Sequence, residues 1–188
     1  MNLDEFGNLL PGEIAKHVPK SMIFAAGGTR RAARLAGIHD QDEYARWSSG
    51  QLIESFGLFA KYGVKHILTH AIVPTQWMEV TPEYRENLIA WVGGILTSEE
   101  TVAEFQRRGW RACLIGAEFI PELKPAADTL STLFPRKDYH FTVYYIVTPY
   151  YDSHWKDLFS IFESGLSTQS ELIFAQYHEE ITPIKLYI

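Results

Sequence analysis

The chain has 188 residues, of which 46% are hydrophobic and 21% charged, and this fits one compact domain with a sizeable core. Its formal net charge of −6 gives no long-range field to attract nucleic acid or an anionic membrane surface, so any anion site must be local. The N-terminus is acidic and no stretch approaches roughly 18 consecutive apolar residues, so we expect neither a signal peptide nor a membrane span.

A strand, a glycine turn and a short helix are the first predicted elements. The apolar run at 22–25 predicts the strand, which leads into Gly27 and Gly28. Residues 30–36 are good helix formers, and Gly37 ends that helix.

A long amphipathic helix is predicted at 42–62, because apolar side chains recur there at helical spacing before the closing Gly63. Residues 65–72 form the second predicted strand. The segment 73–77 contains Pro74, which cannot continue a central strand, and we interpret the segment as a functional loop.

The rest of the chain continues the alternation of helices and strands. In chain order, the predicted elements are a helix at 82–96, a helix from the cap at 98 to 108, a strand at 110–116, a helix at 124–134, a strand at 139–147 and helices near 153–163 and 168–179. The single Cys113 is expected to be a buried strand residue, and one cysteine fits a reducing compartment.

Strands separated by helices of these lengths predict right-handed crossovers and an α/β fold. We expect a single domain over residues 1–188, in a three-layer αβα arrangement with a mainly parallel central sheet. Ligands of such folds gather beyond the carboxyl ends of the strands.

The turn at 27–31 is the strongest candidate for a functional site. A strand that feeds two glycines and then a helix places backbone N–H groups and the positive end of a helix dipole at one point, which suits a phosphate. The side chains that follow add a hydroxyl and always-ionised guanidinium groups, which bind phosphate oxygens bidentately. These side chains are Thr29, Arg30, Arg31 and Arg34.

The alternative is a plain tight turn whose arginines are solvated or paired with Asp40, Asp42 and Glu43. The chain has neither the Walker-type phosphate loop nor the dinucleotide-binding glycine pattern, so both of those sites are excluded.

Aromatic residues make up 14% of the chain, so some rings are expected to line an apolar cavity. The rings of most interest are Tyr44, Trp47, Trp77 and Trp91, with core packing as the alternative for the three tryptophans. His70, near the end of the second predicted strand, is a candidate to contact the ligand or accept a proton, with a structural role as its alternative.

The segment 24–31 and the long helix that follows resemble the cis-prenyltransferase superfamily (undecaprenyl diphosphate synthase-like), whose first strand ends in an Asp-Gly-Asn/Thr-Arg-Arg motif. The resemblance is greatest to the diterpene synthase branch typified by tuberculosinol/tuberculosinyl-adenosine synthases. It runs from about residue 22 to the end of the chain and includes 63–67, 95–100 and 139–147.

This resemblance implies a terpene synthase or prenyltransferase that binds a prenyl diphosphate, with a diterpenyl chain favoured, and ionises it, leaving a carbocation in an apolar tunnel. Residues 28–31 match the diphosphate-binding motif, and Tyr44 matches an active-site tyrosine of the branch. The residues assigned to catalysis are Arg30, Arg31 and Tyr44. Those assigned to substrate binding are Gly27, Gly28, Thr29, Arg34, His70 and Trp77.

The sequence departs from the family pattern in two places. Gly27 stands where the family has an aspartate that binds magnesium or helps trigger ionisation. We therefore expect either a metal-independent site or Mg²⁺ bound only through the substrate diphosphate, with no metal ligand from the protein. Related chains continue beyond Ile188 with a strand and a basic segment, so the domain is expected to lack that segment, or a partner chain covers the apolar run at 184–188.

Two further interpretations stay open. The chain is either an active enzyme or a non-catalytic relative that binds prenyl diphosphate as a subunit of an active partner, and an unrelated phosphometabolite enzyme is a third hypothesis. Because domains of this family usually pair, the resemblance also implies a homodimer, and the composition predicts a cytoplasmic location.

Overall fold

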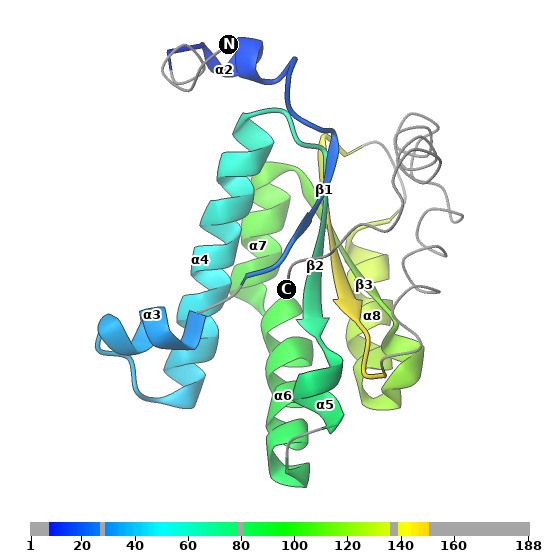
Figure 1. Ribbon diagram of the computed structural model, residues 1–188. Coiled ribbons are helices and arrows are strands. Elements are labelled where there is room, and N and C mark those ends of the chain that lie inside the picture. The colour runs from blue at the N-terminus through cyan, green and yellow to red at the C-terminus, as the bar shows by residue number, and fades with distance from the viewer. Residues whose placement is uncertain (1–7, 27–28, 79–80, 136–138, 151–188) are drawn as a thin grey trace, which may run out of the picture.

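A four-stranded parallel sheet forms the centre of the molecule (Figure 1), in a computed structural model that describes residues 8–26, 29–78, 81–135 and 139–150. The strand order is β1-β2-β4-β3, and each neighbouring pair is parallel. The strands are β1 (Ser21–Phe24), β2 (His66–Ile72), β3 (Trp110–Ile115) and β4 (Phe141–Val147). The predicted α/β class and parallel sheet are confirmed.

Helices connect these strands close to the positions that the sequence predicts. The side chains of Asp40, Thr81 and Ser98 each accept a backbone N–H at the start of a helix. The helices are α2 (Pro11–Ile14), α3 (Thr29–Leu35), α4 (Gln41–Lys61), α5 (Pro74–Met78), α6 (Pro82–Leu96), α7 (Glu99–Arg108) and α8 (Lys124–Leu133), with 3-10 turns η1 (Ala117–Phe119) and η2 (Pro121–Leu123).

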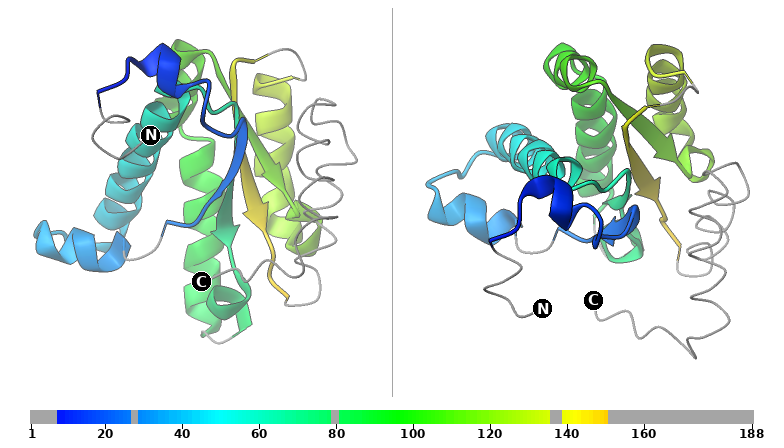
Figure 2. Two further views of the ribbon diagram at one scale, coloured as in Figure 1. Left: turned by 45° about the horizontal axis from the view of Figure 1, so that its top comes forward. Right: turned by 90° about the horizontal axis from the view of Figure 1, so that it is seen from above.

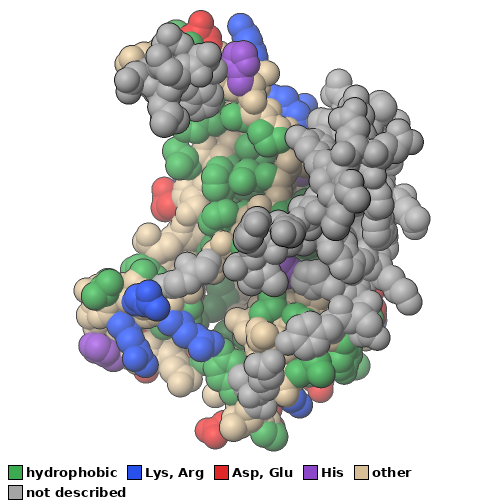
Figure 3. All heavy atoms as spheres, viewed as in Figure 1, with side chains coloured by type: hydrophobic (Ala, Val, Ile, Leu, Met, Phe, Trp, Pro, Cys, Tyr) green, Lys and Arg blue, Asp and Glu red, His purple; other side chains and the backbone are tan. Residues whose placement is uncertain are grey.

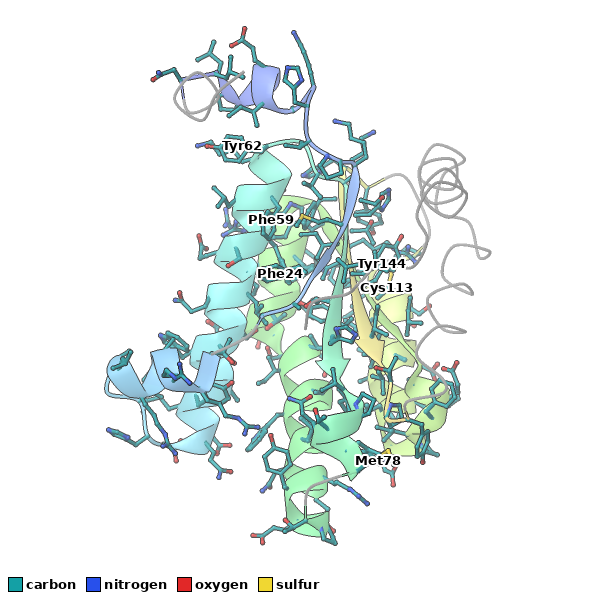
Figure 4. The ribbon with its side chains drawn as sticks, in the orientation of Figure 1. Phe24, Phe59, Tyr62, Met78, Cys113 and Tyr144 are labelled. Atoms are coloured by element: carbon teal, nitrogen blue, oxygen red, sulfur yellow. The ribbon has the colours of Figure 1, made fainter. Side chains whose placement is uncertain are left out.

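The larger helices α4, α6, α7 and α8 lie on one side of the sheet (Figure 2). Their apolar side chains pack on the strand residues that point to that side, such as Ile67 and Val143, which are fully buried. Phe24 of β1 and Phe59 of α4 meet edge to face at 5.2 Å and point toward one another (Figure 4).

The other face of the sheet carries Leu68, Tyr144 and Ile146, with Cys113 of β3 beside Tyr144 of β4 (Figure 4). Cys113 is half-buried, which corrects the expectation of a buried residue, because it points away from the described helices. The helices predicted near 153–163 and 168–179, which would supply the third layer, lie outside the described residues.

Residues 74–78 form the short helix α5, so the prediction of a loop at this position is wrong. Pro74 ends the strand, as expected, but it also occupies the first helical position, where its fixed φ favours a helix. The side chain of Gln76 accepts the backbone N–H of Val73 at 3.1 Å, which is half of a capping box.

An ion-pair network fixes α4 against α7. Arg108 donates to Glu54 of α4 at 2.7 Å and to Glu104 at 2.5 Å, and its guanidinium lies 4.8 Å above the Trp110 ring. Hydrogen bonds from Arg107, and then from Arg108, lower the pKa of Glu104 to about 2. The network adds a polar contact between α4 and α7 to the apolar packing of the helical layer.

Glu104→Gln should reduce the acid sensitivity of the fold. Because the pKa of Glu104 is lowered from 4.5 to about 2, the ionised form stabilises the folded state above about pH 4.5, and this is lost as the pH falls toward 2. Since the pair is open to solvent, we expect a difference of about 1 kcal/mol or less. Urea unfolding of the wild type and of Glu104→Gln, near neutral pH and again well below the ordinary carboxyl pKa, measures the difference. If both proteins lost the same free energy of unfolding on acidification, the role of the network would be contradicted.

Gly116→Ala should strongly destabilise the protein. Gly116 has a φ of +80°, and a Cβ there would collide with the carbonyl oxygen of Val147. We expect a loss of at least about 2 kcal/mol in the free energy of unfolding, measured by denaturant titration. Gly50→Ala in α4, with open space around it, is the control and should stabilise by about 0.5–1 kcal/mol. A Gly116→Ala protein as stable as the wild type would show that this edge of the sheet can relax.

Candidate active site

A cavity of about 180 Å³ opens between α4 and α6, near the carboxyl ends of β2 and β4. This is the edge at which parallel α/β folds bind ligands. The cavity is lined by Arg30, Tyr44, Ala45, Ser48, Ser49, Leu52, His70, Ala71, Gln76, Tyr84, Leu88, Trp91, Val92, Ile95, Leu96 and Tyr145.

Most of the wall is aliphatic or aromatic, with a few polar groups. Within the described part of the chain, Arg30 is the only Lys or Arg side chain in the lining, and no carboxylate takes part in it. An apolar wall with one cation at its edge fits a ligand that has a hydrocarbon body and an anionic head.

Tyr44 and Thr29 join α4 to α3 beside the cavity. Their hydroxyl oxygens are 2.7 Å apart, and either can donate the hydrogen bond. Thr29 is the first residue of α3, so this bond holds the start of the helix, with the adjacent Arg30, against α4.

Arg30 lies over an aromatic ring. Its guanidinium carbon is 5.3 Å from the centre of the Tyr84 ring of α6, which is within range of a cation–π interaction. The Tyr84 ring meets Trp91 edge to face at 6.1 Å, and the Trp91 indole donates to Asp42 of α4 at 3.3 Å. These contacts connect α3, α6 and α4 around the cavity.

The sheet contributes two polar side chains, His70 of β2 and Tyr145 of β4. Burial raises the pKa of Tyr145, so its hydroxyl stays neutral at physiological pH and can serve as a hydrogen-bond donor or acceptor. Its ring also packs edge to face on Phe56 at 6.3 Å, which fixes its direction.

Of the site residues predicted from the sequence, Arg30, Tyr44 and His70 line the cavity. Thr29 lies beside it through its bond to Tyr44. Gly27 and Gly28 are outside the described residues.

Arg31 and Arg34 are exposed on α3 and do not line the cavity. Figure 3 shows Lys and Arg side chains gathered over this helix. In the described ranges, neither arginine forms an ion pair with the acidic residues at 40–43, so the paired form of the alternative has no support, whereas the exposure of both side chains agrees with its solvated form. Their contact with a ligand stays a prediction.

Trp77 does not line the cavity; it is half-buried and packs against the core cluster that contains Ile72 and Leu88. The Arg85 guanidinium lies 5.4 Å above its ring. Because 74–78 is a helix, Gln76 and Trp77 point in different directions, and Gln76 is the one that reaches the cavity. Trp47 is also absent from the lining, whereas Trp91 belongs to it.

Tyr84 and Tyr145 are cavity residues that the sequence analysis did not single out. The sequence does contain a signal for Tyr84, because Tyr84, Leu88, Trp91 and Ile95 recur at helical spacing along α6 and all line the cavity. Tyr145 belongs to an unbroken buried strand, where no periodicity marks one residue.

The described residues contain no group of three or more His, Cys, Asp or Glu side chains that could hold a metal ion. Together with the carboxylate-free lining, this gives Mg²⁺ no fitting set of protein ligands in that part of the chain. No helix there is both long and apolar enough to cross a membrane.

The Thr29–Tyr44 bond should be measurable as a coupling energy. Thr29→Val and Tyr44→Phe each remove one partner of the bond, and we expect each to lower the free energy of unfolding by about 1 kcal/mol. The two losses should not be additive, because either change alone already breaks the bond. Thermal or denaturant unfolding of both single variants and the double variant gives the coupling. Additive losses would contradict a bond between these hydroxyls.

No protein-family model matches the chain. Over 177 residues it is 33% identical to a (+)-kolavelool synthase from Herpetosiphon aurantiacus, an alignment that covers 93% of this chain and 61% of that protein. The chain therefore spans less than two thirds of that relative's length.

Among solved structures, lavandulyl diphosphate synthase from Lavandula x intermedia, in complex with dimethylallyl diphosphate, aligns with a TM-score of 0.58. The alignment covers 89% of this chain and 71% of that one at 15% sequence identity. The resemblance found in the sequence is thereby confirmed: the chain has the cis-prenyltransferase-like fold and is related along most of its length to a terpene synthase.

Proposed function

We propose that the chain binds a prenyl diphosphate and ionises it, as a terpene synthase or prenyltransferase. The observation that carries this proposal is the position of Arg30, a cation at the edge of an aromatic and aliphatic cavity, at the ligand-binding edge of a parallel sheet. The kolavelool synthase relative and the lavandulyl diphosphate synthase neighbour support it.

In this proposal Arg30 binds the diphosphate. Breaking the carbon–oxygen bond moves negative charge onto the departing diphosphate, so a fixed guanidinium stabilises the transition state more than the ground state. The bond between Thr29 and Tyr44 keeps this cation in place during the reaction. Arg31, Arg34 and the glycine turn complete the diphosphate site in the proposal.

In the proposal, the cavity holds the hydrocarbon. Its aliphatic wall excludes water from the carbocation, and the rings of Tyr44 and Trp91 can stabilise positive charge. In the proposal, His70 accepts a proton, and Tyr145, whose hydroxyl stays neutral, orients an acceptor such as water.

No step is assigned to a protein-bound metal. In the proposal, Mg²⁺ accompanies the substrate through its diphosphate oxygens, which are the ligands it prefers. A diterpenyl substrate, a homodimer and a cytoplasmic location are further parts of the proposal; the first two follow from the family resemblance and the third from the composition.

A panel of prenyl diphosphates of increasing chain length, assayed with Mg²⁺ and with a chelator, tests the proposal. We expect pyrophosphate release with a long-chain member of the panel. Saturable binding without product would favour the non-catalytic relative, for which Gly27 is the motivation. Binding of short sugar phosphates but of no prenyl diphosphate would favour the phosphometabolite enzyme.

Arg30→Ala should lower kcat for pyrophosphate release by about 10²-fold or more, because it removes a charge aimed at the leaving group. Arg30→Lys should recover only part of that loss, since an ammonium lacks the planar fork. Lys124→Ala on α8 removes the same charge from an exposed position outside the lining and is the matched control. Equal rates for Arg30→Ala and the control would overturn the role of Arg30.

A further inference from the structure

We propose that Tyr84 is a positioning residue that holds the Arg30 guanidinium at the mouth of the cavity. The inference rests on the proposed function, because it concerns how the diphosphate-binding cation is oriented. Tyr84 is not part of the sequence motif that includes Arg30, and it comes from a different helix, α6.

The geometry fixes the ring before any ligand arrives. Tyr84 lies in the first turn of α6, where its backbone N–H donates to the Thr81 side chain at 3.3 Å. Its ring is half-buried and meets Trp91 edge to face at 6.1 Å with an interplanar angle of 87°. The Arg30 guanidinium lies 5.3 Å from the centre of this ring, so the Arg30 side chain, which is exposed, has a defined position.

An aromatic partner suits a cation that must bind an anion. A carboxylate would neutralise Arg30 and would have to be displaced by the diphosphate, whereas a ring face attracts the guanidinium and leaves its N–H groups available. Asp42 of α4 accepts the Trp91 indole N–H at 3.3 Å. In the described part of the chain, Arg30 forms no ion pair with a carboxylate.

Preorganisation of this kind improves binding because less side-chain freedom is lost when the ligand arrives. Removing the Tyr84 ring should therefore weaken anion binding when Arg30 is present, and should have little effect on anion binding when Arg30 is absent. That dependence separates a positioning residue from one that merely stabilises the fold.

Isothermal titration with inorganic pyrophosphate tests this on the full chain. We expect Tyr84→Leu to weaken pyrophosphate binding about three- to fivefold, the range of an exposed cation–π contact, and Tyr84→Phe to stay within about twofold of the wild type. In an Arg30→Ala background, Tyr84→Leu should change the affinity by less than about twofold. Tyr84→Met replaces Tyr84→Leu if the latter does not fold.

The control is Tyr62→Leu, which removes a ring of the same kind that lies 5.5 Å from the Lys61 ammonium, outside the cavity lining. It should leave pyrophosphate affinity unchanged. A Tyr84→Leu penalty that persists in full without Arg30, or a Tyr84→Phe variant as weak as Tyr84→Leu, would overturn the inference while leaving the proposed function intact. A wild-type chain that binds neither pyrophosphate nor any prenyl diphosphate would overturn both.

Discussion

The arrangement of the site depends on one constraint, that all four described strands run parallel and end at the same edge of the sheet. Each segment that follows a strand then begins at that edge, so α3, α5 and the loop at Gly116 gather around it. The close approach of Gly116 to the Val147 carbonyl shows how tightly this edge is packed. Residues as distant in sequence as Arg30 and Tyr145 can therefore share one cavity.

Local signals were enough to locate most of the elements. Gly37, Gly63 and Gly109, all with positive φ, mark helix ends, and Ser98 marks a helix start, because each satisfies a backbone requirement that few other residues meet. Local sequence signals could not predict the strand order β1-β2-β4-β3, since it depends on which strands pair across long connections. At α5 the signals were present, but Pro74 was interpreted only as the end of a strand, although it also begins a helix.

The site was predictable only where its residues belong to a local motif. Arg30 follows the first strand and His70 lies near the end of the second, so reasoning from strand ends reaches both, whereas Tyr44 of α4 was selected by the family resemblance. Neighbouring helix positions are about 100° apart, which explains why Arg30 faces the cavity while Arg31 faces solvent. For Tyr84, the helical spacing along α6 marks one face of that helix, but which elements this face meets depends on core packing, which the sequence alone does not show.

The distribution of charge gives the site its selectivity. The chain as a whole is acidic, with a net charge of −6, so it repels anions at long range, and binding must be decided by contacts at the cavity. There, the exposed guanidinium of Arg30 borders an apolar wall, and among the described residues no carboxylate pairs with it. In the proposed complex, burying a diphosphate deep in such a wall would be unfavourable, so we propose that the head group lies at the end with α3 and the hydrocarbon inside. The contacts of Arg30 with Tyr84, and of Thr29 with Tyr44, hold the cation at that boundary.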